Sequence, residues 1–377
     1  MTLLNKEITE TERMYAFGLQ SVPGIGNKTI QKLLERYETF ENIYKAPSKE
    51  LEGALKEKQF AAFDLSRSKA DFKRQYEKMK QKEIEILLWG EKDYPKNLRE
   101  IEDAPRVLFY KGKMPDEAQP TVAIIGAREC SAYGSYVAGE IGRYLGQNHI
   151  GVISGMARGI DGISQAAALD AGGKSYGVLG SGVDVCYPKS NQQLYDRLLE
   201  KGGIISSYAP GVLPVAQNFP PRNRIVSGLS DAVIVVEARN KSGTLITVDM
   251  ALEQGREVFV VPGRITDRLS DGCNRLLMQG AGVFLNSEDF LTQLQQICMK
   301  KGKTLCPKEV SLFAGDKSKQ TDDPILNFIE FTPVDIEEIF RKIGDKGWDY
   351  GKISHALMKL CMQGRVKQIS PGKFVRV

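Results

Sequence analysis

From Thr121 onward the chain repeats one unit, a short apolar strand followed by a glycine turn and, in most cases, an amphipathic helix. Strands are predicted at Val122–Ile125, Gly151–Ile153, Ser175–Leu179, Gly203–Ile205, Ala232–Val236, Glu257–Val261 and Gly282–Phe284, and helices at Ser131–Gln147, Gly162–Ala171 and Thr244–Gly255. Strands that are apolar throughout are typical of a parallel sheet covered by helices on both faces. The repeat therefore predicts an α/β fold with an extended Rossmann-like, doubly wound parallel sheet.

The segments that flank this repeat predict two smaller modules. Residues 11–82 have helical periodicity, and predicted helices at Thr11–Gln20 and Asn27–Tyr37 enclose a Pro-Gly-Ile-Gly turn at residues 23–26. This pattern resembles a helix-hairpin-helix module, whose glycines either expose N–H groups to a phosphate or only make a tight turn. After residue 323, three predicted helices (Pro324–Glu330, Val334–Ile343, Tyr350–Met362) precede a hairpin, which is a winged-helix pattern.

These patterns predict four sections along the chain. Residues 1–83 form an all-α domain of the helix-hairpin-helix or SAM-like type. Residues 84–298 form the extended Rossmann-like domain and open with strands at 84–88 and 107–111. Residues 299–323 are polar and read as a linker, and residues 324–377 form the winged-helix domain.

The charge distribution limits how the chain can bind a polyanion. Residues 121–298 contain 15 Lys and Arg against 16 Asp and Glu, whereas residues 299–377 contain 15 against 10. A central domain of net charge −1 cannot bind nucleic acid through bulk charge. It needs a few placed cations and backbone amides instead.

The composition favours a soluble protein of a reducing compartment, and we expect a cytoplasmic location. Six cysteines at positions 130, 186, 273, 298, 306 and 361 form no CxxC pair, so neither a zinc site nor a disulfide framework is expected. No apolar run is long enough to cross a membrane. The polar, acidic stretch from Met1 to Met14 is not a signal peptide.

Five glycine-bearing segments are predicted at the carboxyl ends of the strands, where doubly wound sheets bind ligands. They begin at Gly126, Ser154, Gly180, Phe219 and Glu237, and each carries or is followed by a cation. The cations are Arg128, Arg158, Lys189, Arg222 or Arg224, and Arg239 or Lys241. Several phosphate-sized cradles along one edge suit a strand of phosphates better than one mononucleotide, and Phe219 and Tyr187 could stack bases.

A purely structural explanation of the same segments stays open. Glycines occur at such turns in any α/β fold for steric reasons. Some of the arginines could pair with Asp161, Asp184 or Glu237 and hold the loops together.

The segments nevertheless resemble the DNA-processing protein A family (DprA, also called Smf) from about Ile84 to Phe290. The resemblance rests on Ser154–Asp161, Phe219–Ser230, Ser242–Thr247, Pro262-Gly263 and Gly272–Leu276, in this order and spacing. It implies a single-stranded DNA-binding protein that protects incoming DNA in natural transformation. It also implies loading of a RecA-type recombinase onto that DNA, and a homodimer built through the central domain.

The resemblance also implies particular site residues. Carried over residue by residue, it gives Gly126, Arg128, Ser154, Gly155, Lys189, Phe219 and Arg222 as DNA-binding residues. The glycine-bearing segments add Arg158, Asn223, Arg224 and Lys241 to the expected DNA-binding residues. Family members often carry a basic residue just before the Phe-Pro-x-Arg-Asn-Arg run. Here Ala216, Gln217 and Asn218 stand there, so one contact is missing or supplied elsewhere. The dimer or partner surface is expected at Asn274, Leu276, Leu277 and Met278, because three adjacent apolar side chains cannot all face inward.

The alternative function is a nucleotide phosphoribohydrolase of the LOG-like superfamily, whose corresponding loop ends in a catalytic glutamate. This chain has Thr247 at that position, and a threonine cannot exchange the required proton at neutral pH. No P-loop, catalytic triad or metal-ligand cluster is visible, so no catalytic residue, metal or cofactor is expected.

The basic face of the predicted winged helix has several possible roles. Lys352, His355 and Lys359 recur along one predicted helix, and Lys367, Lys373 and Arg376 lie on the wing. This face could bind duplex DNA, contact a protein, act as an autoinhibitory module or simply be solvated.

Overall fold

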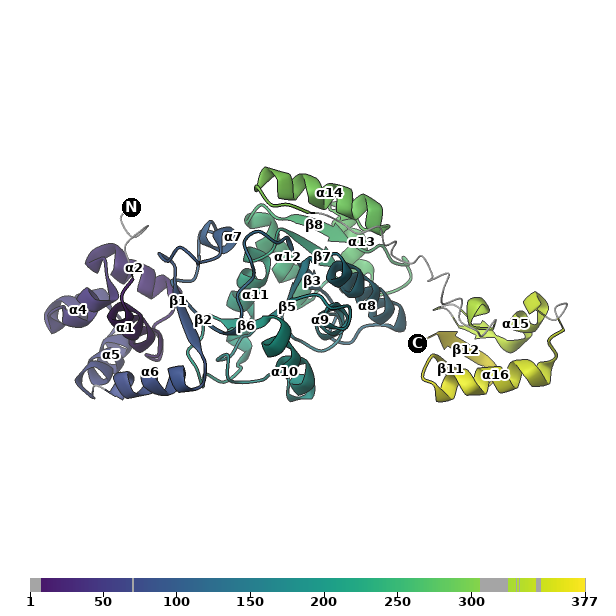
Figure 1. Cartoon of the computed structure of the whole chain (residues 1–377), viewed down its shortest axis with the longest axis horizontal. Coiled ribbons are helices and arrows are strands. Elements are labelled where there is room, and N and C mark those ends of the chain that lie inside the picture. The colour runs from purple at the N-terminus through teal and green to yellow at the C-terminus, as the bar shows by residue number, and fades with distance from the viewer. Residues whose placement is uncertain are drawn as a thin grey trace.

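The computed structural model describes residues 8–69, 71–305, 325–329, 331, 333–343 and 347–376. Figure 1 shows helices from the N-terminal part at one end, a large sheet in the middle and a small α/β unit from the C-terminal part at the other end. The mixed α/β class, the large parallel sheet and the helical N-terminal region predicted above are confirmed.

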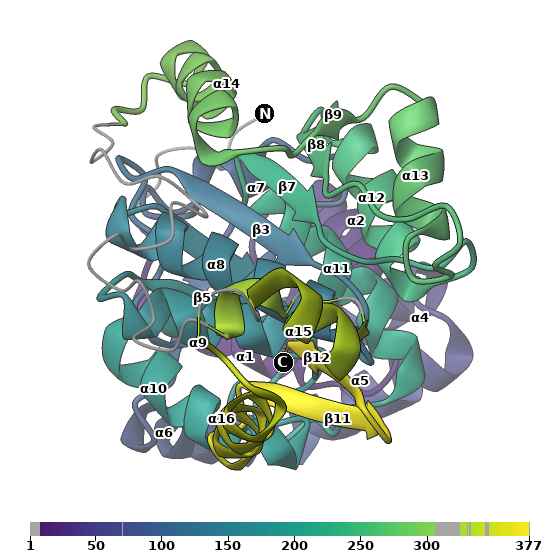
Figure 2. The ribbon, with the colours of Figure 1, turned by 90° about the vertical axis from the view of Figure 1, so that its right-hand side faces the viewer.

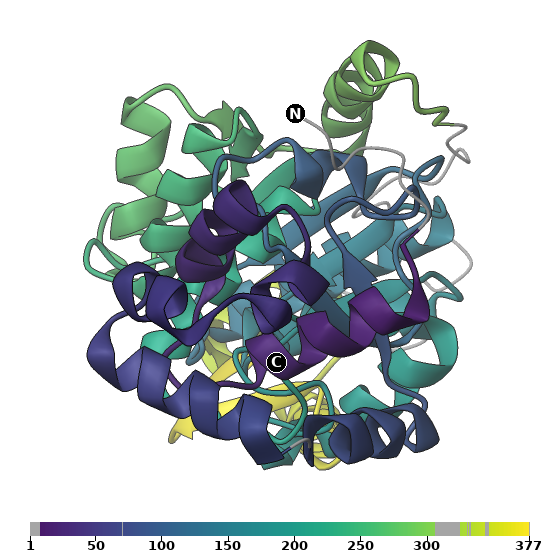
Figure 3. The ribbon, with the colours of Figure 1, turned by 90° about the vertical axis from the view of Figure 1, so that its left-hand side faces the viewer.

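The N-terminal region consists of helices in the part that the structure describes. They are α1 (Glu10–Gln20), α2 (Asn27–Tyr37), α3 (Phe40–Lys45), α4 (Ser48–Ala54), α5 (Glu57–Lys69) and α6 (Asp71–Gln81). They cover the sheet at its β1 end (Figure 3) and share an apolar core with it. Phe17 of α1, for example, meets Phe109 of strand β2 edge-on with ring centroids 6.2 Å apart.

The central sheet has nine strands in the order β1-β2-β6-β5-β4-β3-β7-β8-β9. Their bounds are β1 (Glu85–Leu88), β2 (Val107–Gly112), β3 (Thr121–Ile125), β4 (Gly151–Ser154), β5 (Ser175–Val178), β6 (Gly203–Ser206), β7 (Ala232–Val235), β8 (Glu257–Val260) and β9 (Gly282–Val283). Strands β3 to β9 are parallel, whereas β2 pairs antiparallel with both β1 and β6. The sheet is therefore mixed rather than wholly parallel.

Helices cover both faces of the sheet, and Figure 2 shows β3 and β7 between them. On one face pack α8 (Ala132–Gln147), α9 (Ile160–Asp170) and α14 (Ser287–Lys300). On the other face pack α7 (Lys96–Arg99), α11 (Phe219–Gly228), α12 (Gly243–Glu253) and α13 (Asp271–Met278). The connection from β5 to β6 contains η1 (Lys189–Asn191) and α10 (Gln192–Lys201), and η2 (Ala216–Asn218) precedes α11.

One element differs from its prediction in a way that matters for the site. The family resemblance implies that Phe219 and Arg222 lie in a loop, but the structure begins helix α11 at Phe219. Pro220 and Pro221 stand in the first turn, where proline loses no intrahelical hydrogen bond and its fixed φ suits a helix. Phe219 and Arg222 therefore project from a helix rather than from a loop.

The C-terminal part has its own apolar core and a small sheet. Its elements are η4 (Leu326–Phe328), β10 (Val334–Asp335), α15 (Ile336–Ile343), α16 (Tyr350–Met362), β11 (Val366–Ser370) and β12 (Lys373–Arg376), with strand order β10-β12-β11. The prediction of a helix at Pro324–Glu330 is wrong for the described residues of that range, since only a short 3₁₀ turn forms there. The predicted helix Val334–Ile343 begins instead as strand β10.

Candidate nucleic-acid interface

A cleft of about 740 Å³ opens at the carboxyl ends of β3 and β7. The chain builds the sheet outward from β3 to β6 and then crosses back to place β7 on the other side of β3. At such a reversal the loops after the two central strands diverge, which leaves a crevice between them. The loops after β3, β4 and β7 and the first turn of α11 line this cleft.

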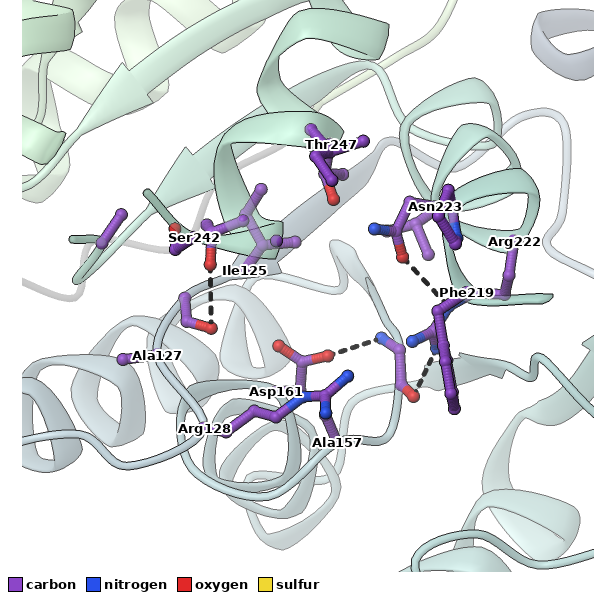
Figure 4. Close-up of a pocket in the computed structure, with 18 of the residues that line it drawn as sticks. Ile125, Ala127, Arg128, Ala157, Asp161, Phe219, Arg222, Asn223, Ser242 and Thr247 are labelled. Atoms are coloured by element: carbon purple, nitrogen blue, oxygen red, sulfur yellow. Dashed lines mark hydrogen bonds between the residues drawn. The ribbon is translucent and has the colours of Figure 1, made fainter. Parts of the chain in front are cut away.

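Arg128 is a cation of the cleft wall that no described acid engages. It follows β3 on the loop before α8, is exposed, and has no carboxylate within ion-pair distance among the residues that the structure describes. Its guanidinium lies 5.5 Å from the ring centroid of Phe219. Figure 4 shows Arg128 on one side of the cleft and Phe219 on the other.

Two aromatic rings stand beside this cation. Phe219 is half-buried at the start of α11, and Tyr187, 42 % exposed, lies with its ring centroid 5.8 Å away and tilted by 38°. Both residues line the cleft. A cation next to two accessible rings is the combination that binds a phosphate and stacks a base.

Arg222 was expected to contact DNA, but protein groups already engage it. Its side chain is buried, and Nη1 donates to the carbonyl oxygens of Gly155 and Val178, each at 2.5 Å. Nε donates to Oδ1 of Asn223 at 3.1 Å. Burial lowers the pKa of Arg222 to about 10, although the nearby Asp161 opposes this change.

Asp161 is the charge partner beneath the cleft. Its carboxylate is buried and accepts a hydrogen bond from the backbone N–H of Gly155 at 3.0 Å (Figure 4). Burial raises the pKa of Asp161, and Arg222 and the surrounding hydrogen bonds only partly offset this. Arg222 and Asp161 thus tie α11 to the loop after β4 and form the floor of the cleft.

Ser154 and Gly155 serve this floor too. Ser154 is fully buried, and its Oγ donates to the carbonyl oxygen of Ile124 at 2.6 Å. A Cβ at Gly155 would collide with the guanidinium of Arg222. The group that approaches the backbone of Gly155 closely is therefore Arg222 of the protein itself and not DNA, which the sequence leads us to expect there.

Gly126 lies in the wall of the cleft, and its carbonyl oxygen accepts from Oγ1 of Thr244 at 3.2 Å, which joins the end of β3 to α12. Asn223 also lines the cleft. Arg224 lies elsewhere, since it pairs with Asp103 at 3.3 Å and Glu253 at 3.8 Å and lines a different hollow.

The remaining predicted cations lie outside the lining of the cleft. Arg158, Lys189 and Lys241 are all exposed. Arg239, which is not among the expected DNA-binding residues, is the cation of the β7–α12 loop that does line the cleft. The sequence could not separate Arg239 from Lys241, because the two residues follow the same strand and stand only two positions apart.

The predicted dimer segment is partly buried in the central domain and partly exposed to solvent. Leu276 is buried, whereas Met278 is 89 % exposed, so the expectation that some apolar side chain faces outward is confirmed. Asn274 holds the loop at Gly263, accepting from its N–H at 3.3 Å and donating to its carbonyl oxygen at 3.1 Å. Asn274 therefore has a structural contact of its own.

Each flanking module also contacts the central region. At the start of α2, Asn27 Nδ2 donates to the carbonyl oxygens of Asp103 and Ala104, both at 3.1 Å, which docks the predicted hairpin against the central region. Phe331 lies 4.5 Å from Tyr136 of α8, ring to ring, and Arg376 lies 5.8 Å from the same tyrosine ring.

Two features are absent from the residues that the structure describes. No helix there has the length and apolar content that would let it span a membrane. No group of three or more His, Cys, Asp or Glu side chains in the same residues is arranged to hold a metal ion.

Comparison with known proteins gives a consistent result. Residues 85–295 match the family model described as "DNA recombination-mediator protein A". The DNA processing protein DprA of Streptococcus pneumoniae is 44% identical over 202 residues, which cover 54% of this chain and 71% of that protein. The protein Smf of Synechocystis is 33% identical over 355 residues, which cover 89% of this chain and 88% of the relative.

Solved structures agree with this result. The X-ray structure of DprA from Streptococcus pneumoniae matches with a TM-score of 0.65 at 36% identity and covers 74% of this chain and 97% of that one. A structure of DNA processing protein A from Helicobacter pylori, described for its single-stranded DNA binding mode, matches with a TM-score of 0.51 at 30% identity. It covers 56% of this chain and 96% of that one.

Proposed function

The chain belongs to the DNA recombination-mediator protein A family, and we propose that it binds single-stranded DNA in the cleft between β3 and β7. The observation that carries this proposal is the position of the unpaired Arg128 beside the ring of Phe219, which in turn lies next to the ring of Tyr187. Phosphates would bind Arg128 and Arg239, and bases would stack on the two rings. In Helicobacter pylori the related protein binds single-stranded DNA, which supports the same ligand here.

The binding test compares oligo-dT of about 20 nucleotides with a duplex of equal length by fluorescence anisotropy at several salt concentrations. We expect tighter binding of the single strand, because stacking needs unpaired bases. Arg128→Ala should weaken binding about tenfold and lower the salt slope by about 0.7, which corresponds to one lost phosphate contact.

The matched control is Lys174→Ala, which removes an exposed cation just before β5, at the opposite edge of the sheet. This variant should bind oligo-dT like the unmodified chain. Equal affinity for duplex and single strand, or an Arg128→Ala variant that binds as well as the control, would refute the cleft as the DNA site.

A hydrolase is not supported by the arrangement of groups in the cleft. Thr247 lines the cleft and is 4% exposed, in the place where the hydrolases carry their glutamate. The carboxylate of Asp161 accepts a hydrogen bond from the N–H of Gly155. Glu237, at the end of β7, accepts from the N–H and the hydroxyl of Ser131. Release of free base from nucleoside monophosphates would contradict a purely binding role.

The proposal extends to the biological role that the family resemblance implies. In it, the chain protects incoming DNA during natural transformation and loads a RecA-type recombinase, which would place it in the cytoplasm. Loading is tested by recombinase filament growth on oligo-dT coated with single-strand-binding protein, with and without this chain. Equal filament growth in both reactions would exclude a loading role.

We also propose a homodimer through the β9 edge of the sheet. Strand β9 pairs only with β8 among the described strands, and Met278, Val283 and Leu285 beside it are 89 %, 43 % and 64 % exposed. An apolar edge strand of this kind needs a partner. Light scattering at micromolar concentration should report a dimer that Met278→Glu dissociates, and a monomeric unmodified chain would contradict the proposal.

The division into residues 1–83, 84–298, 299–323 and 324–377 belongs to the proposal as well. The separate core of the C-terminal part supports its last unit, which we propose to be a winged helix with a basic face for duplex DNA or protein. The first boundary is less independent, because the N-terminal helices share their core with β1 and β2.

A further inference from the structure

A second hollow lies beside the cleft, on the far side of the loop after β4. We call it the side groove. Its polar lining residues are Arg158, Ser190, Asn191, Gln193 and Arg197, and apolar residues complete the lining. The groove has a volume of about 350 Å³. It is formed by the start of α9, by η1 and by the first turns of α10.

The lining of the side groove has positive charge and no compensating acid. It contains two arginines and no aspartate or glutamate. Arg158 is exposed and makes no ion pair with any described residue. Arg197 pairs at 2.6 Å with Asp170, which is itself 67 % exposed and lies outside the lining. A concave surface with one unpaired cation, and a second cation whose acid partner is exposed to solvent, concentrates anions.

The side groove is continuous with the cleft through a short stretch of backbone. Ala157 lines both hollows. The N–H of Ile160 donates to the carbonyl oxygen of Ala127 at 3.2 Å, which holds the loop after β4 against the loop that carries Arg128. A Cβ at Gly159, whose φ is +71°, would collide with the carbonyl oxygens of Ala127 and Arg128, so only glycine lets the two loops pack this closely.

A side-chain amide fixes the other wall of the groove. Asn191 Nδ2 donates to the carbonyl oxygens of Met156 and Ala157 at 3.0 and 3.1 Å. This contact ties η1 to the loop after β4. It leaves Tyr187 in the cleft and Ser190 in the side groove, with the exposed Lys189 between them in the chain. The segment that joins the two hollows therefore contains one exposed cation.

From this arrangement we propose that a DNA strand leaving the cleft passes over Ala157 into the side groove, where Arg158 and Arg197 bind its phosphates. The inference rests on the proposed function and adds a second phosphate-binding segment to it. The lining of the groove has no aromatic residue, so the groove holds the sugar-phosphate backbone without stacking bases and is indifferent to sequence.

The test uses oligonucleotide length to separate the two hollows. Oligo-dT of about 5 nucleotides occupies the cleft alone, whereas oligo-dT of about 20 nucleotides reaches the side groove. Arg158→Ala should weaken binding of the long oligonucleotide about fivefold and lower its salt slope by about 0.7. Binding of the short oligonucleotide should be unchanged, and Lys174→Ala should change neither.

A variant that adds charge keeps the test independent of any loss of folding. Gln193 is exposed and lines the groove, so Gln193→Lys should tighten binding of the long oligonucleotide and raise its salt slope by about 0.7. Arg158→Lys should bind like the unmodified chain, because the charge is retained.

The outcomes distinguish the two proposals. If Arg158→Ala and Gln193→Lys leave the long oligonucleotide unaffected while Arg128→Ala weakens it, the side groove is refuted and the cleft stands. If Arg158→Ala weakens the short and long oligonucleotides equally, Arg158 acts on the cleft and the extension is refuted. If Arg128→Ala also has no effect, the proposed function itself fails.

Discussion

At the scale of single residues, the arginines around the cleft differ in what their charges are available for. Arg128 is exposed and free of acids, so its charge can meet a phosphate. Arg222 is buried and satisfied by two carbonyl oxygens above Asp161, and Arg224 is paired with two acids. Three arginines that the sequence presents alike therefore divide into one that can bind a ligand and two that hold the protein together.

This division predicts opposite phenotypes for two arginine-to-alanine variants. Arg222→Ala leaves the buried carbonyl oxygens of Gly155 and Val178 without their side-chain donor and removes a positive charge near the buried Asp161, so it should lower the free energy of unfolding by about 3 kcal/mol. Arg128→Ala should change that free energy by less than about 0.5 kcal/mol. Urea denaturation of both variants measures this, and equal stabilities would contradict the roles assigned here.

A second buried acid, Asp231, makes the stability of the fold depend on pH. It precedes β7 and pairs with Lys303 at 2.8 Å and Lys301 at 3.3 Å, while Asn97 donates to it at 2.8 Å. Burial alone would raise the pKa of Asp231, but the lysines and hydrogen bonds outweigh burial, and the net change is a lower pKa. A carboxylate with a lowered folded-state pKa stabilises the fold above its unfolded pKa, near 4, and loses that contribution as pH falls.

Asp231→Asn should therefore destabilise the chain by about 2 kcal/mol at neutral pH. The difference from the unmodified chain should shrink as the pH falls below about 4, where the native carboxyl is also becoming protonated. Urea denaturation at several pH values measures this difference. A stability difference that does not change with pH would show that Asp231 acts through shape rather than charge.

At the scale of elements, the loop with Arg128 is held at both ends. Strand β3 precedes it, and Ser131 caps α8 after it, accepting from the N–H of Gly134 at 3.0 Å. Glu237, at the end of the neighbouring β7, accepts from the N–H of Ser131 at 2.9 Å and from its hydroxyl at 2.5 Å. Burial raises the pKa of Glu237, which places the acid as a positioning group within the protein.

Glu237→Ala should remove this support from the capped end of α8. We expect a loss of about 1–2 kcal/mol in the free energy of unfolding, together with weaker binding of oligo-dT because the Arg128 loop is no longer fixed. Glu237→Gln keeps an acceptor and should preserve both properties. Loss of both properties in the glutamine variant would indicate that the negative charge, not the hydrogen bond, is required.

At the scale of the whole molecule, the residues after α14 complete the central core. Lys301 and Lys303 follow α14 and reach back to Asp231 beneath β7. The C-terminal part has a separate apolar core. The end of the central unit is therefore set by these two lysines, a few residues beyond the boundary at 298 that composition predicts.

Two truncations that differ by five residues test this end point. A chain ending at residue 305 retains both lysines. Its central domain should unfold at nearly the same urea concentration as the central domain of the full chain. A chain ending at residue 300 leaves Asp231 without both cations and should lose about 3 kcal/mol. Equal stability of the two truncations would contradict the role of the lysine pair.

The sequence by itself determined the order of the central strands along the chain, because apolar runs and glycine turns are local patterns within a few residues. That order places Gly126, Arg128 and the β7–α12 loop at one sheet edge. Only the tertiary structure decided which cations are free. Arg222 interacts electrostatically with Asp161, 61 positions away, and Arg224 pairs with Asp103, 121 positions away. Such pairings depend on how distant segments pack, and no local pattern carries that information.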